Sequence, residues 1–193
     1  MPMEHSSHFF FAVRIPEQTK LRMQEHIEKI KERIPFSRWV HYQDLHITLA
    51  FLGSAPPDKL KQAENQVQEA LKDVQTFTLK INKLGFFGNV DSPRVFWADT
   101  EESKNLQSIR NKVFSACEEA GFQLETRPFR PHITLARKWK GEQPFQPELL
   151  GLWEEFQPVP LSFEAGEVVI YQTHLDKTPK YEAIKIYPLV DKN

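Results

Sequence analysis

The pattern of hydrophobic and polar positions predicts strands and helices in alternation along the chain. Residues 9–15 form an aromatic and β-branched run that ends at Pro16, which indicates a buried strand. From residue 17 to 34, apolar side chains recur mostly at steps of three and four, which predicts an amphipathic helix that Pro35 stops. Residues 38–40 and 45–53 return to strand character. This part of the chain therefore predicts strand, helix and strand.

The middle of the chain predicts a further helix and strand before the order begins again. Pro56 and Pro57 open a helical stretch to about residue 72, and residues 76–87 alternate like a strand that ends in a turn. A strand at 94–100, a helix at 102–120 closed by Gly121 and a strand at 130–137 follow. Residues 139–158 show no clear pattern, and late strands are expected at 161–173 and 181–189.

Each half of the chain thus runs strand, helix and strand, with no low-complexity linker between the halves. We expect an α+β fold: one compact domain over residues 1–193, built of two pseudo-symmetric lobes. Antiparallel-rich sheets flanked by helices would meet at a central cleft.

The composition narrows the class of protein. Hydrophobic residues make up 40% and charged residues 26% of the 193, with a net charge of −1, as in ordinary globular proteins. Binding of long duplex nucleic acid by charge alone is not expected, although a local basic groove remains open. Cys117 is the only cysteine, so no intrachain disulfide can form and we expect a buried thiol. The N-terminus lacks a signal-peptide pattern and no apolar run approaches a membrane span, so we expect a cytoplasmic protein with no membrane partner.

The pentapeptide HITLA occurs twice, at residues 46–50 and 132–136. On a strand, side chains alternate between two faces, so His46 shares a face with Thr48, and His132 shares one with Thr134. On a helix, residues two apart point about 200° away from each other and could not serve one site. With lobes related by a pseudo-twofold axis, the two His-x-Thr pairs would face each other across the cleft.

This constellation suits proton transfer at a phosphodiester. Two imidazoles can remove one proton and deliver another near neutral pH, and threonine hydroxyls can donate to anionic oxygens. A single histidine on a strand is more often structural, but two copies with matching flanks favour catalysis. Because the motifs are nearly symmetric, the residues alone leave open which histidine is the acid. No metal-ligating cluster and no glycine-rich phosphate loop is found, so we expect no metal and no cofactor.

Three further residues are candidates for substrate binding. Regular alternation turns Arg137 to the face opposite His132, but a bulge in the strand could re-aim it. Arg130 shares the face of His132 by parity and would hold a phosphate or remain a solvated charge. Among the three phenylalanines at residues 9–11, Phe11 is a candidate for stacking on a base, although a buried first strand explains most of that run.

At these motifs the chain resembles the 2H phosphoesterases, named for two His-x-Thr-x motifs, and within them the RNA 2′,3′-cyclic phosphodiesterases, historically called 2′-5′ RNA ligases. The resemblance covers nearly the whole chain and is carried by "FFFAVRIP", "LHITLAFLG", "RVFWAD", "FRPHITLAR" and "VVIYQTHLDKTPKYEAIKIYPL". It implies metal-independent hydrolysis of a 2′,3′-cyclic phosphate, on an RNA 3′ end or a nucleotide, to a 2′-phosphomonoester. It also implies that His46 is the proton donor, His132 the proton acceptor, and Thr48 and Thr134 the groups that position the phosphate. Arg137 would stack on the base or pair with phosphate.

Besides hydrolysis of a small cyclic nucleotide or of a linear 2′-5′ linkage by the same residues, two alternatives remain open at this point. One is ATP-independent 2′-5′ joining of RNA ends, the same chemistry in reverse, which hydrolysis should outweigh in dilute water. The other is an RNA-end-binding module without turnover, although all four motif residues are present. No obligate protein partner is expected in any of these cases.

Overall fold

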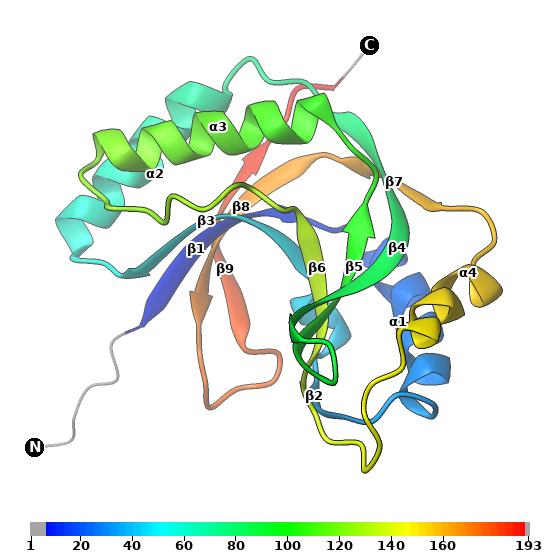
Figure 1. Ribbon diagram of the computed structural model, residues 1–193. Coiled ribbons are helices and arrows are strands. Elements are labelled where there is room, and N and C mark those ends of the chain that lie inside the picture. Colours follow the sequence, from blue (N-terminus) through cyan, green and yellow to red (C-terminus); the bar gives the residue numbers. More distant parts are fainter. Residues whose placement is uncertain (1–6, 192–193) are drawn as a thin grey trace, which may run out of the picture.

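A computed structural model describes residues 7–191 of the chain, so the outermost residues of the predicted domain lie outside the described part (Figure 1). Within it, two antiparallel sheets combine with four α-helices, which confirms the α+β prediction. The first sheet has the order β3-β1-β8-β9, formed by His46–Ser54, His8–Arg14, Glu167–Thr173 and Tyr181–Pro188. The second has the order β2-β6-β5-β4-β7, formed by Phe36–Trp39, His132–Trp139, Ser92–Thr100, Phe77–Asn89 and Leu161–Ala165.

The two sheets repeat one arrangement of four strands. The order β3-β1-β8-β9 in the first corresponds to β6-β5-β4-β7 in the second, and every neighbouring pair is antiparallel. Strand β2 is added beside β6. Both HITLA segments therefore begin the equivalent strand of their sheets, and these two strands, β3 and β6, lie close together.

The helices cover the sheets from two sides. Helices α2 (Pro57–Leu71) and α3 (Lys104–Glu119) pack side by side across the top of Figure 1, whereas α1 (Glu17–Lys31) and α4 (Leu152–Phe156) lie together on the right. Helix α1 ends at Lys31, three residues before the predicted stop. Ile34 directly precedes Pro35, and this position disfavours the helical conformation.

Two segments differ from the sequence-based expectation. The strand expected over residues 161–173 is wrong: the chain breaks at Gly166, so that β7 joins one sheet and β8 the other. The unassigned residues 139–158 contain a 3₁₀ turn at Pro147–Gly151 followed by α4. Each is five residues long, which is too short for a helical period to show in the sequence.

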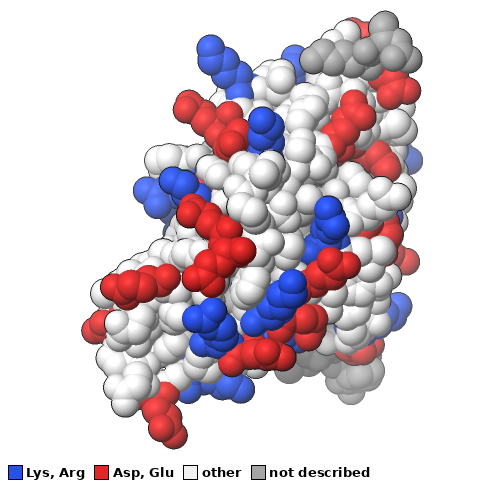
Figure 2. Space-filling model, turned by 90° about the vertical axis from the view of Figure 1, so that its right-hand side faces the viewer, with Lys and Arg blue, Asp and Glu red and all other residues white. Residues whose placement is uncertain are grey.

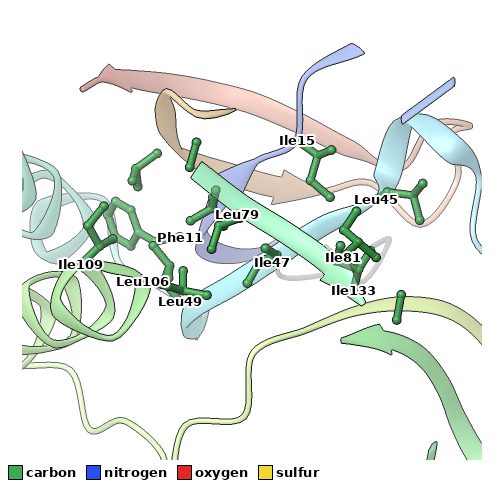
Figure 3. Close-up of a cluster of buried hydrophobic side chains, with 14 of the residues drawn as sticks. Phe11, Ile15, Leu45, Ile47, Leu49, Leu79, Ile81, Leu106, Ile109 and Ile133 are labelled. Atoms are coloured by element: carbon green, nitrogen blue, oxygen red, sulfur yellow. The ribbon is translucent and has the colours of Figure 1, made fainter. Parts of the chain in front are cut away.

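One hydrophobic core joins the two sheets. Ile47 and Ile133, the second residues of the two motifs, are both fully buried in it and anchor their strands from opposite sheets (Figure 3). Cys117 is buried there as well, as predicted, and burial raises the pKa of its thiol to about 12, so that it stays protonated at neutral pH. None of the helices between residues 7 and 191 is long and apolar enough to cross a membrane.

The assignment of Phe11 to substrate binding is corrected by its place in this core. Its side chain is 0% exposed, and its ring lies 6.1 Å from that of Tyr187 (Figure 3). Phe10 instead points to the other face of the strand, where its ring lies 4.8 Å from that of His46. The aromatic residue next to the motif is therefore Phe10.

Candidate active site

Both motif strands carry a bulge at the same position. In β3, Leu49 is an extra residue between consecutive partners on β1, and in β6, Leu135 is an extra residue between consecutive partners on β5. A bulge bends a strand and changes which way the following side chains point. The identical placement means that the two copies of HITLA share local geometry as well as sequence.

The bulge decides the orientation of Arg137. On β5, Trp97 pairs with Thr134 and Val95 pairs with Arg137. Residues two apart on one strand share a face, so Arg137 is turned to the face of His132 and Thr134. With regular alternation, Arg137 would lie on the face opposite His132. The bulge, which was the alternative considered from the sequence, turns its side chain to the face of His132.

The residue that follows the first motif at the same interval is Phe51. It lies opposite Phe10 on β1, on the face of Thr48, and its side chain is 56% exposed. The two motif strands thus present an arginine and an exposed phenylalanine at corresponding positions.

Backbone carbonyls fix the tautomer of both histidines. The Nδ1–H of His46 donates to the carbonyl of Asp44, and that of His132 donates to the carbonyl of Arg130, each at 2.7 Å. A carbonyl has no proton to give, so Nδ1 carries the hydrogen in both rings. In the neutral form, Nε2 of each ring therefore holds a lone pair.

The two Nε2 atoms differ in their partners. Nε2 of His46 lies 3.0 Å from Oγ1 of Thr48, so the neutral ring accepts a hydrogen bond from this hydroxyl. Within residues 7–191, His132 makes no matching bond to Thr134, which leaves its Nε2 open to other groups. Among the hydrogen bonds of the described residues, this difference separates the first His-x-Thr pair from the second.

Aromatic rings surround both imidazoles. Phe10 and Tyr181 flank His46, with ring centres at 4.8 and 5.2 Å. Phe87 lies edge-on to His132 at 5.0 Å, and Trp97 lies at 6.1 Å. These rings replace water around the imidazoles and restrict their movement.

Burial disfavours the charged form of both imidazoles. It lowers the pKa of His46 from 6.5 to about 4. The bond to Asp44 opposes this shift, while the charges of Lys20 and Lys180, and that of His132 when it is protonated, add to it. The interaction with His132 also indicates that the two motifs lie near each other. A bound anion would favour protonation of His46, because it places an opposite charge next to the ring.

The pKa of His132 is lowered as well, mainly by burial and further by the charge of Arg137. The negative charge of the Asp99 carboxylate opposes this shift. Asp99 lies directly across from His132 on β5, and burial raises the pKa of its carboxyl. At neutral pH the uncharged ring of His132, with its open Nε2, is therefore suited to accept a proton.

A groove of about 770 Å³ joins the two motifs, with Thr48 and His132 both in its wall. Arg130 is exposed and also lines this groove, while its backbone carbonyl positions His132. Of the predicted site residues, Thr48, His132 and Arg130 line the groove itself. His46 lies against Thr48, and Thr134 and Arg137 share the face of His132. Among the described residues, no three His, Cys, Asp or Glu side chains gather as a metal site would require.

Asp44 is a positioning residue that the sequence interpretation missed. Its carboxylate, 5% exposed, accepts hydrogen bonds from the backbone N–H groups of Lys180 and Tyr181 at 3.0 and 3.1 Å. These two hydrogen bonds connect the start of β9 to the segment before His46 and hold the Tyr181 ring against the imidazole of His46. The available signal was an aspartate two residues before the histidine, which is too common to be informative.

Gly85 makes room for the ring beside the second motif. Gly85 pairs with Trp97 across β4 and β5, and a Cβ at this position would overlap the indole ring. We expect Gly85→Ala to lower the free energy of unfolding by about 1–3 kcal/mol, the usual cost of overpacking. Gly151→Ala is the matched control, because that Cβ would meet nothing within 4 Å. Urea unfolding of both variants measures the difference, and equal stability would contradict the described packing.

Comparisons with known proteins agree on one family. Residues 19–177 match the sequence model described as the 2′-5′ RNA ligase superfamily. The chain is 41% identical over 184 residues to the RNA 2′,3′-cyclic phosphodiesterase of Geobacillus stearothermophilus, covering 95% of this chain but only 58% of that protein. It is 36% identical to the Bacillus subtilis protein of the same name, with 92% of this chain and 93% of that protein covered.

Solved structures share the fold. Escherichia coli LigT complexed with 3′-AMP superposes with a TM-score of 0.74 at 23% identity, covering 95% of this chain and 98% of that one. Thermus thermophilus TT0787 gives a TM-score of 0.78 at 22% identity, covering 96% and 100%. At these identities the likeness extends to the arrangement of strands and helices.

Proposed function

Because the chain belongs to the 2′-5′ RNA ligase superfamily, we propose that it hydrolyses a terminal 2′,3′-cyclic phosphate on RNA to a 2′-phosphomonoester. The observation that carries the proposal is the placement of two bulged His-x-Thr strands, one from each sheet, beside one groove, with both imidazoles held as Nδ1–H tautomers. We take residues 1–193 as one catalytic domain and the cytoplasm as its compartment, where Cys117 would stay reduced.

The proposed mechanism divides proton transfer between the two histidines. His132 accepts a proton from water at its open Nε2, and the resulting hydroxide attacks phosphorus. The bond from phosphorus to the 3′ oxygen breaks, and His46, protonated when the phosphate anion is bound, delivers a proton to that oxygen. The 2′ ester bond is retained, so the product is the 2′-phosphate.

The hydroxyls and cations hold the phosphate in this proposal. Thr48 and Thr134 donate to non-bridging oxygens, which orients the phosphorus between the two rings. Arg137, turned inward by the bulge, neutralises negative charge as it develops in the transition state. Lys20 and Lys180 contribute positive potential on the side of His46.

The test is a hydrolysis assay in EDTA on adenosine 2′,3′-cyclic phosphate and on a short RNA ending in the same group. The expected product is the 2′-phosphate alone, identified by chromatography against both isomers. A well-folded protein that opens neither substrate would contradict the proposal, and tight binding without turnover would support the RNA-end-binding module instead. Efficient 2′-5′ joining with negligible hydrolysis would support the ligase.

A further inference from the structure

The groove beside the motifs extends well beyond the reacting groups. From Thr48 and His132 it continues between β3, helix α3 and the segment 121–131, which crosses the molecule below α3 in Figure 1. Its volume of about 770 Å³ is in the upper part of the range found for small-ligand sites, whereas the cyclic phosphate needs only the end at the motifs. The remaining length is therefore available to another part of the substrate.

Arginine side chains line this remaining length. Four are present, Arg94, Arg110, Arg127 and Arg130, and the acidic residue among the lining side chains is Glu125. Arg127 forms an ion pair with Glu125, and both are exposed. Within residues 7–191 the other three arginines have no carboxylate within ion-pair distance, so the groove carries net positive charge.

Arg110 is held in place with one of its polar groups unsatisfied, while its Nη1 donates to Oδ1 of Asn111 at 3.4 Å. Its guanidinium lies 4.0 Å from the centre of the Phe114 ring and 5.4 Å from that of Phe129. Its Nε is buried and has no hydrogen-bond partner among the described residues. A buried donor without a partner is costly, and an anionic oxygen in the groove would satisfy the cation as a whole.

Aromatic rings share the lining of the groove with these cations. Phe51 is exposed on the side of the motif, while Phe87, Phe114 and Phe129 are half-buried along the lining. Arginines that track a backbone, interleaved with rings on which bases stack, are the usual means of binding single-stranded nucleic acid.

We propose that this groove binds the single-stranded RNA segment on the 5′ side of the cyclic phosphate, so that the enzyme favours an oligonucleotide over a mononucleotide. The inference rests on the proposed function. In a terminal 2′,3′-cyclic phosphate both the 2′ and the 3′ oxygens are occupied, so the chain can leave the site only through the 5′ phosphate of the last nucleotide. A groove that starts at the motifs is therefore the natural path for that strand.

The charge distribution supports a local rather than a general attraction. The net charge is −1, and on the face shown in Figure 2 positive and negative side chains are interspersed. The arginines of the groove give the complementary charge at the place where the phosphates of the RNA would run.

The test compares kcat/KM for a hexaribonucleotide ending in adenosine 2′,3′-cyclic phosphate with that for the mononucleotide. We expect the wild type to favour the hexamer by about tenfold or more, and Arg110→Gln to lower this ratio about fivefold, from lost phosphate and stacking contacts. Arg94→Gln is a second variant at an exposed position. Arg22→Gln is the matched control, since it removes the same charge from the exposed side of α1.

A binding measurement separates this inference from the proposed function. Fluorescence anisotropy with a labelled hexamer ending in a 2′-phosphate should give weaker binding for Arg110→Gln and Arg94→Gln, and a dependence on salt that is less steep by about 0.7 per lost phosphate contact. If the protein hydrolysed neither substrate, the proposed function would be contradicted. The anisotropy measurement would still test whether the groove binds RNA. Equal kcat/KM for hexamer and mononucleotide, or variants that bind like Arg22→Gln, would overturn the groove proposal.

Discussion

His46→Ala and His132→Ala should each lower kcat/KM for a 2′,3′-cyclic phosphate by about 10²–10⁴-fold, the usual contribution of a placed proton-transfer group. Both rings are fixed through Nδ1 to a backbone carbonyl and flanked by aromatic rings, so alanine removes a preorganised group that water cannot replace. Steady-state kinetics in EDTA measure the loss.

His174→Ala provides the control for this experiment. Its Nε2 lies 3.0 Å from the Glu182 carboxylate, and it is not part of either motif. We expect this variant to keep wild-type kcat/KM within about twofold. Thermal unfolding of all three variants checks that the fold is intact. If His46→Ala or His132→Ala, fully folded, retained wild-type activity, the two-histidine mechanism would be wrong.

A modified substrate can assign the two roles. When sulfur replaces the bridging 3′ oxygen, the leaving group is a thiolate, which departs without a proton because its pKa is far below that of an alcohol. Loss of the general acid should then matter little, whereas loss of the general base should matter as before. On this substrate, we expect the loss of kcat/KM caused by His46→Ala to be at least tenfold smaller than on the oxygen substrate. The loss caused by His132→Ala should stay the same. The opposite pattern would exchange the roles.

The grouping of the four motif residues into two His-x-Thr pairs could be predicted from the sequence because it depends on local order. A strand period of two places His46 with Thr48, and His132 with Thr134, whatever the rest of the chain does. The long helices were predictable for the same reason, since each shows several turns of apolar periodicity.

Features set by contacts between distant segments could not be predicted. Whether Arg137 faces the site depends on Leu135 being skipped in the pairing with β5, and nothing in HITLA alone marks that bulge. Phe11 is buried because β1 pairs with β3 on one side and with β8 on the other, which only the sheet order reveals. Asp44 acts through β9, more than 130 positions away in the chain.

The stability of the protein should fall at mildly acidic pH because of His46. Its pKa is about 4 in the folded chain against 6.5 for an ordinary histidine, so between these values the unfolded chain binds more protons than the folded one. The free energy of unfolding therefore falls as the pH drops through 6.5 toward 4. The full effect is roughly 3 kcal/mol, from 1.36 kcal/mol per pKa unit.

Urea unfolding of the wild type and of His46→Gln at pH 7.5, 6 and 5 tests this expectation. Between pH 7.5 and 5 the wild type should lose about 2 kcal/mol more than the variant, because all other titrating groups are common to both. His174→Gln, which alters an imidazole paired with Glu182, controls for the loss of any histidine. Parallel pH profiles for wild type and His46→Gln would mean that the imidazole of His46 is charged at little cost in the folded protein. It would then be ready to act as an acid before substrate binds, and the bound phosphate would not be needed to protonate it.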